Sequence, residues 1–157
     1  MAKAGYTLPM GAPVALVATV AKTALCVICP AQFGIDLTKM RLGFDGVTAS
    51  AVPVLVEFCD STLASNSTPG TNNSIGTVTQ VYGRSITAGF TGFYASTTEP
   101  TVLTRYDSWS LTPNGGLIIY DWPLGSTHDS AVSAGIAIRL TAPAAVNANG
   151  AVWFERC

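Results

Sequence analysis

Short runs of alternating apolar and polar residues, separated by turn-forming residues, recur along this chain of 157 residues. Helical periodicity is nearly absent, whereas alternation over four to eight residues is typical of a half-buried β-strand. Residues 52–59 show the pattern clearly, because Val52, Val54, Val56 and Phe58 fall on one face of an extended chain. The pattern therefore predicts an all-β fold built from antiparallel strands.

The spacing of these runs predicts how the strands are organised. We expect strands at residues 14–29, 36–44, 52–59, 77–82, 85–90, 106–111, 117–120, 134–140 and 151–154. Short strands with turn signals every 8–12 residues or so are typical of a β-sandwich, and a jelly roll is one form it could take. Between two of the strands, the sequence Pro-Asn-Gly-Gly at 113–116 predicts a hairpin, because Asn and Gly tolerate positive φ.

Three other segments mark the limits of the domain. Residues 1–11 have no periodic pattern and are expected to form an extended N-terminal arm, which leaves 12–157 as a single β-sandwich domain. Residues 61–76 form a polar tract that predicts a long exposed loop. Pro53 has no amide hydrogen to donate, so it should lie at an edge or at the start of its strand.

The low content of charged residues indicates what surrounds the folded domain. A chain of this length buries roughly 70% of its unfolded surface and needs no metal or disulfide to build a core. Its charged fraction is only 11%, against about 25% in a typical soluble domain. Free monomers usually keep charges on their surface for solubility. A charge-poor surface favours an oligomer or a larger lattice.

The distribution of charged and apolar residues argues against nucleic-acid binding and against a membrane span. The eight basic residues are scattered, and no stretch has the clustered Lys and Arg that neutralise several phosphates, so we expect no direct nucleic-acid contact. Residues 12–21 follow Lys3 as in a signal peptide, but the run has only a weak cleavage site and is interpreted as a buried strand. No uninterrupted apolar run of about 18 residues occurs, so no membrane span is expected.

The cysteines give no indication of redox or metal chemistry. Cys26 and Cys29 have C-x-x-C spacing, but strand alternation places their thiols on opposite faces. A zinc site would need a second pair, and Cys59 and Cys157 are isolated in the sequence. Buried strand cysteines are the preferred interpretation, and no cofactor or metal is expected.

No set of residues predicts an enzyme active site. His128 is the only histidine and lies within Ser-Thr-His-Asp-Ser at 126–130, but adjacent loop residues do not converge into a catalytic triad. Four carboxylates could in principle form a glycosidase pair, although their distances cannot be derived from the sequence: Glu57, Glu99, Asp107 and Asp121. The chain is therefore expected not to be an enzyme.

A carbohydrate-binding or adhesive module is the alternative interpretation. Several aromatic residues could stack on sugars: Tyr94, Trp109, Tyr120, Trp122 and Trp153. Aromatic residues on strands are more often core or interface anchors. Two glycosylation sequons begin at Asn66 and Asn72, but without a secretory signal they are interpreted as parts of an ordinary polar loop.

Three segments resemble a known group of proteins: residues 44–57 (FDGVTASAVPVLVE), 99–103 (EPTVL) and 153–156 (WFER). With them, most of the chain after the arm is similar to small structural proteins of tailed bacteriophages, and in role to the head decoration, or cement, proteins. The resemblance implies a homotrimer of β-sandwich domains on the capsid surface of the virion, where it clamps neighbouring major capsid proteins. It implies no catalytic residues.

The N-terminal arm is the segment we expect to contact other subunits. Extended segments can bind by adding a strand to a neighbouring sheet, with side-chain pockets that fix the register. The expected assembly contacts are Tyr6, Leu8, Pro9 and Met10. Under this hypothesis, deletion of residues 1–11 abolishes particle binding and leaves the fold intact.

Overall fold

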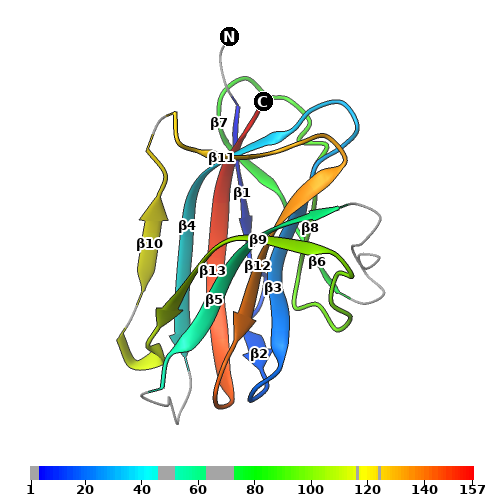
Figure 1. The fold of residues 1–157 in the computed structure, drawn as a ribbon. Coiled ribbons are helices and arrows are strands. Elements are labelled where there is room, and N and C mark those ends of the chain that lie inside the picture. Colours follow the sequence, from blue (N-terminus) through cyan, green and yellow to red (C-terminus); the bar gives the residue numbers. More distant parts are fainter. Residues whose placement is uncertain (1–3, 46–51, 63–72, 116, 124) are drawn as a thin grey trace.

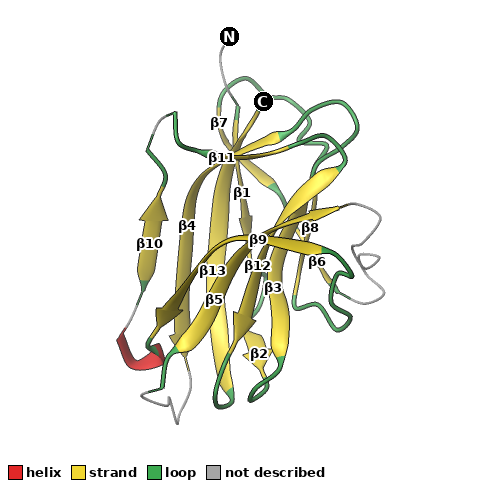
Figure 2. Cartoon of the chain, viewed as in Figure 1, coloured by secondary structure: helices red, strands yellow, loops and turns green. Residues whose placement is uncertain are grey.

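Two antiparallel β-sheets pack face to face in the computed structural model (Figures 1 and 2), which describes residues 4–45, 52–62, 73–115, 117–123 and 125–157. Among these residues the only helical element is one 3₁₀ turn, η2 (Pro113–Gly115). The predicted all-β sandwich is therefore confirmed. The end of the polar tract, residues 73–76, is described and contains β6 (Ser74–Gly76), but residues 63–72 and both sequon asparagines lie outside the described residues.

The first sheet, called sheet I, has the order β10-β4-β13-β1-β7, with β11 beside β4 and β2 beside β13. Its strands are β1 (Gly5–Pro9), β2 (Val14–Leu16), β4 (Ile35–Asp45), β7 (Thr79–Tyr82), β10 (Ile118–Asp121), β11 (His128–Ser130) and β13 (Val146–Arg156). β13 runs the length of the sandwich in Figure 1 and pairs with three strands. It is the centre of this sheet.

The second sheet, sheet II, has the order β6-β8-β3-β12-β5-β9. Its other strands are β3 (Ala21–Ile28), β5 (Val54–Thr62), β8 (Thr91–Tyr94), β9 (Leu103–Leu111) and β12 (Ala134–Thr141). Pro53 directly precedes β5, which agrees with the expected place of proline at the start of a strand.

The main core lies between the sheets and is formed mainly by inward-facing residues of β1, β2, β3, β4, β5, β12 and β13. Val54, Val56 and Phe58 of β5 are buried there, as the alternation predicts, whereas Val52, which precedes the strand, is 54% exposed. Near the paired ends of β1 and β13, where Tyr6 lies opposite Phe154, four aromatic rings pack with centroids 4.9–5.9 Å apart: Tyr6, Phe33, Phe90 and Phe154. Met40 of β4 also lies in this core and is fully buried.

The N-terminal segment is not an arm. β1 pairs with β13 on one side, from Gly5↔Glu155 to Pro9↔Ala151, and with β7 on the other. Tyr6 and Leu8 point into the main core and are 1% and 0% exposed. The domain boundary expected at residue 11 is therefore wrong for residues 5–9. Only two inward-facing residues alternate in this short strand, too few for a detectable pattern.

The strand expected at 14–29 is two strands in different sheets. The chain leaves sheet I after β2 and enters sheet II at β3. Between them, Thr19 has a φ of 62°, and its amide donates to the Ala142 carbonyl oxygen at 2.7 Å. This left-handed residue reverses the chain, which a run of apolar residues does not reveal.

Two other local predictions are also wrong. No strand forms over 85–90, where Gly89 has a φ of +68°, and the strand β8 follows at once. The Pro-Asn-Gly segment at 113–115 does not close a hairpin, because β9 lies in sheet II and β10 in sheet I. The turn carries the chain from one sheet to the other.

We predict that Tyr6 and Leu8 stabilise the fold and do not bind neighbours. Leu8→Ala should lower the free energy of unfolding by about 2–5 kcal/mol and Tyr6→Ala by about 3–5 kcal/mol, because each leaves a cavity in the core. Pro9→Ala is the control, since Pro9 is exposed at the end of β1. Urea unfolding curves measure all three. Unchanged midpoints in the Tyr6 and Leu8 variants would contradict the burial.

Candidate functional site

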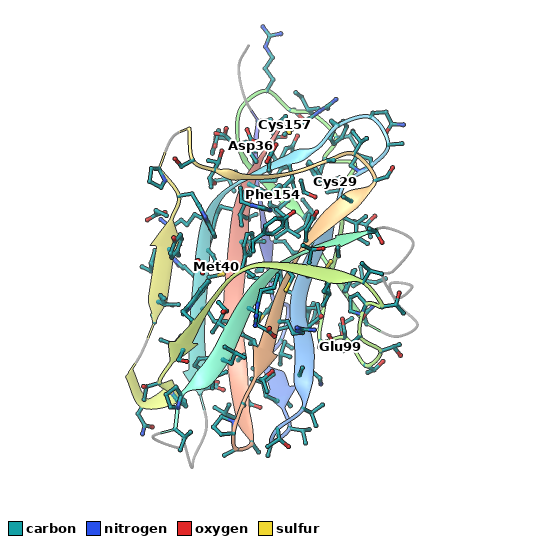
Figure 3. All side chains as sticks on the ribbon, viewed as in Figure 1. Cys29, Asp36, Met40, Glu99, Phe154 and Cys157 are labelled. Carbon is teal, nitrogen blue, oxygen red and sulfur yellow. The ribbon has the colours of Figure 1, made fainter. Side chains whose placement is uncertain are left out.

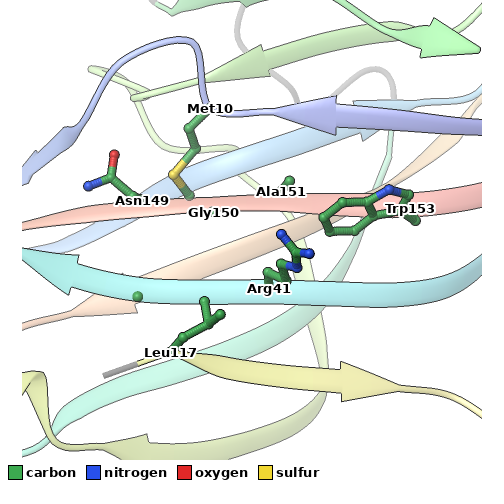
Figure 4. A pocket seen from close by; sticks show the side chains of 8 residues that line it. Met10, Arg41, Leu117, Asn149, Gly150, Ala151 and Trp153 are labelled. Carbon is green, nitrogen blue, oxygen red and sulfur yellow. The ribbon is translucent and has the colours of Figure 1, made fainter. Parts of the chain in front are cut away.

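A hollow of ≈ 310 Å³ lies on the outer face of sheet I (Figure 4). It crosses β4, β13 and the ends of β1 and β10. Its lining residues are Met10, Arg41, Gly43, Leu117, Asn149, Gly150, Ala151 and Trp153. Pockets for small ligands start at about 300 Å³, so the hollow has room for one or two side chains.

The hollow exists because small residues meet on neighbouring strands. On β13, Ala148 and Val152 point into the core, so Asn149, Ala151 and Trp153 point outward. The pairing Asn149↔Gly43 brings a residue without a side chain opposite Asn149, and Ala151 lies opposite Arg41. The bottom of the hollow is therefore formed by small residues, and the larger side chains of Met10, Leu117 and Trp153 form its sides.

Arg41 is the charged group of the hollow. Its guanidinium lies 5.1 Å from the centroid of the Trp153 ring, a cation–π contact. Two residues away on the same strand, Lys39 forms an ion pair of 3.2 Å with Asp121. No carboxylate among the described residues forms an ion pair with Arg41. The hollow thus combines an oriented cation with apolar walls.

The predicted assembly contacts separate into two groups. Tyr6 and Leu8 are core residues of the same chain and are not available to another subunit. Met10 follows β1 and lines the hollow, and its amide donates to the Gly150 carbonyl oxygen at 2.9 Å. Pro9 is exposed on the same outer face. Only Pro9 and Met10 remain as surface residues.

A row of aromatic rings packs between the two sheets, from β5 and β9 of sheet II to β10 and β11 of sheet I. The His128 ring lies 4.2 Å from that of Tyr106 and 4.9 Å from that of Phe58, centroid to centroid. The row continues from Phe58 through Trp122 and Tyr120 to Trp109, with centroids 4.6–5.8 Å apart. These aromatics hold the two sheets together, and Trp109 and Trp122 pack against the main core.

The residues around His128 do not form a catalytic triad. Ser130 donates its hydroxyl hydrogen to Asp60 at 3.0 Å, and Tyr106 donates to the other oxygen of Asp60 at 3.2 Å. Nε2 of His128 is buried and has no hydrogen-bond partner among the described residues. A triad needs the imidazole hydrogen-bonded to both the nucleophile and the acid.

The four carboxylates considered for glycosidase chemistry each hold a structural contact. Glu57 is bound by Arg139 at 2.7 Å and by Arg105 at 3.1 Å, and the hydrogen bonds from Arg139 keep the pKa of Glu57 below its usual value. Glu99, labelled in Figure 3, accepts hydrogen bonds from the amide and hydroxyl of Thr23, both 2.6 Å. Asp121 pairs with Lys39, and Asp107 accepts the amide hydrogen of Ser108.

Cys26 on β3 and Cys29, which directly follows β3, lie on opposite faces of sheet II, as the alternation predicts. Cys29 belongs to the main core, whereas Cys26 belongs to a small separate cluster with Cys59, Ile28, Phe93 and Ala137. Cys26 and Cys59 flank Ala137 from two different strands, roughly 9–10 Å apart by strand spacing, which is too far for a disulfide.

The two cysteines of the C-x-x-C sequence are buried, and their thiols remain protonated at neutral pH. Burial raises the pKa of Cys26 and of Cys29 to about 12. Cys157 is exposed at the end of the sandwich where the chain terminates (Figure 3). In the part of the chain that the structure describes, no three His, Cys, Asp or Glu side chains are grouped as metal ligands, and no helix has the length and apolar character to cross a membrane.

Comparisons of the chain with protein-family models, with curated proteins and with solved structures found no match.

The sequence does not predict the hollow and indicates only part of its lining. Met10 and Trp153 were singled out as an arm contact and as an aromatic, but nothing in the sequence places them on one face. Their common location depends on β1 and β13 being paired. The only sequence signal of the hollow is that the outward-facing residues before Trp153, Asn149 and Ala151, are small. This signal indicates a hollow only once the residues opposite them on β4 are known.

We predict that His128 makes stability fall in mild acid. Burial lowers the pKa of His128 below its ordinary value of 6.5, against the opposite effect of the Asp60 and Asp129 carboxylates. As the pH falls through about 6.5, the unfolded chain therefore binds protons that the folded chain does not, so the free energy of unfolding decreases. Urea unfolding between pH 7.5 and 5.5 measures this decrease.

His128→Phe is the matched variant, because it keeps a ring between Phe58 and Tyr106 and removes the titrating group. The variant should lose less stability over the same pH range than the natural protein. Identical pH dependence in the two proteins would contradict the role assigned to His128.

Proposed function

We propose that the chain is a non-enzymatic structural subunit of a larger assembly, and specifically a decoration protein of a bacteriophage head. The observation that carries the proposal is the exposure of large apolar side chains on both edges of sheet I. Ile119 is 50% exposed on β10, and Val81 and Tyr82 are 53% and 49% exposed on β7. Apolar surface at exposed sheet edges is characteristic of protein–protein contact.

The position of the two edges supports a ring of identical subunits. A cyclic trimer uses a heterologous interface, in which one surface of each copy meets a different surface of the next. β10 and β7 are the two opposite edges of the same sheet. Each copy therefore has two distinct apolar edges to offer, which suits the homotrimer that the resemblance to decoration proteins implies.

The low charge of the chain supports the same role. Only 11% of the residues are charged, and several of these charges pair within the chain, as Glu57 does with Arg105 and Arg139. With a net charge of only −1, the chain has little electrostatic repulsion to keep a free monomer apart from its neighbours. Contacts to a shell of major capsid proteins would cover such a surface.

The carbohydrate-binding alternative has less support. Trp153 is the aromatic that lines the hollow, but Arg41 occupies one face of its ring. Asn149, the neutral polar side chain of the lining, donates its amide hydrogen to Asp45 at 3.1 Å. A sugar would find few free hydrogen-bonding groups there.

The proposed function predicts a defined oligomer and a location on the particle. Light scattering after size exclusion should give the mass of a trimer, and Ile119→Lys should shift it toward monomer, because the charge would lie in the subunit contact. Val132→Lys is the control, since Val132 is equally exposed, at 50%, but lies in the turn before β12. Equal masses for the Ile119 variant and the natural protein would count against the edge contact.

Immunogold labelling of purified phage particles with an antibody to the chain tests the location. Label on the outside of the heads is expected. Label confined to tails, or particles without label, would rule out head decoration.

A further inference from the structure

The hollow on sheet I contains a positive charge, that of Arg41, for which the described part of the chain supplies no ion-pair partner. Of the eight lining residues, Arg41 is the only charged one, and no carboxylate among the described residues forms an ion pair with it. The nearest comparable group, Lys39, is neutralised by Asp121 at 3.2 Å. The two cations are on the same strand and the same face, and they differ in whether the fold pairs them.

The guanidinium of Arg41 is held in place before any partner arrives. Its contact with Trp153, with the guanidinium carbon 5.1 Å from the ring centroid, restricts the side chain, so less side-chain entropy is lost when its N–H groups are engaged. A cation–π contact leaves N–H groups of the guanidinium for hydrogen bonds. A planar guanidinium edge matches a carboxylate, which it binds through two parallel hydrogen bonds.

The walls of the hollow indicate what accompanies that carboxylate. Met10 and Leu117 lie on opposite sides of β4 and β13, and Leu117 is 58% exposed (Figure 4). Met adapts its shape to varied apolar partners. The volume of ≈ 310 Å³ admits one or two side chains.

We propose that this hollow is a docking surface for an extended protein segment that places a Glu or Asp carboxylate on Arg41 and apolar side chains against Met10 and Leu117. The inference rests on the proposed function for the source of that segment, which is a neighbouring shell protein. A protein segment fits better than an acidic sugar, because Arg41 covers one face of the Trp153 ring and Asn149 already donates to Asp45.

The test uses two tripeptides of nearly equal shape, acetyl-Leu-Glu-Leu-amide and acetyl-Leu-Gln-Leu-amide, at millimolar concentration. Their binding to the ¹⁵N-labelled full chain is followed by NMR at the Trp153 indole N–H and the Arg41 Nε–H. The Glu peptide should bind at least tenfold more tightly than the Gln peptide. Raising NaCl from 50 to 500 mM should weaken only the Glu peptide, because salt screens the ion pair.

Arg41→Ala and Lys39→Ala form the matched pair of variants. In Arg41→Ala the preference for Glu over Gln should disappear, whereas Lys39→Ala should keep it within about twofold. Both side chains lie on the outer face of β4, so neither substitution opens a cavity in the core. Retained amide spectra confirm that each variant is folded.

Several outcomes would overturn the proposal. These are equal binding of the two peptides, no binding of either, or the same loss in Lys39→Ala as in Arg41→Ala. Tighter binding of glucuronic acid than of the Glu peptide would assign the hollow to an acidic sugar instead. The peptide assay needs no particle, so its failure leaves the immunogold result standing, and unlabelled particles leave the peptide result standing.

Discussion

Pairing between the first and the last strand of the chain is the constraint on which the rest of this sandwich depends. β13 pairs with β4 over ten residues, with β1 over five and with β2 over three. Without β1, the edge strand β7 would lose its partner, and the core would lose Tyr6 beside Phe90 and Phe154. The two sheets contact each other through the rings of Phe58 and Tyr106 in sheet II and His128 in sheet I.

The same pairing creates the surface to which we assign a function. β1 and β13 bring Met10 and Trp153 to one face, and β4 adds Arg41 opposite Ala151. A core of alternating inward residues necessarily leaves an outward set, and on β4 and β13 this set includes Gly43 and Ala151. The hollow is thus a consequence of the strand order of sheet I. Any binding there depends on the pairing of β1 with β13.

Much of the fold class could be predicted from the sequence, because alternation is a local property. β4, β5 and β12 appear close to their expected places, since each has several inward apolar residues in a row of alternating positions. β1 could not be found, because only Tyr6 and Leu8 carry its pattern. The break at Thr19 was hidden in an apolar run, and the turn at Pro113–Gly115 did not indicate that its two strands belong to different sheets. The site was less predictable than the fold, because it depends on register between segments far apart in the chain.

The position of the two chain ends affects how the domain responds to force. β1 and β13 are adjacent and antiparallel, so the start of β1 at Gly5 and the end of β13 at Glu155 lie side by side (Figure 1). A load applied between the termini would peel these strands apart one residue pair at a time, starting at Gly5 and Glu155. A load carried between the two edges of sheet I instead pulls across β10, β4, β13, β1 and β7 together. A subunit held by its sheet edges would transmit strain through its main-chain hydrogen bonds, while its termini carried none of it.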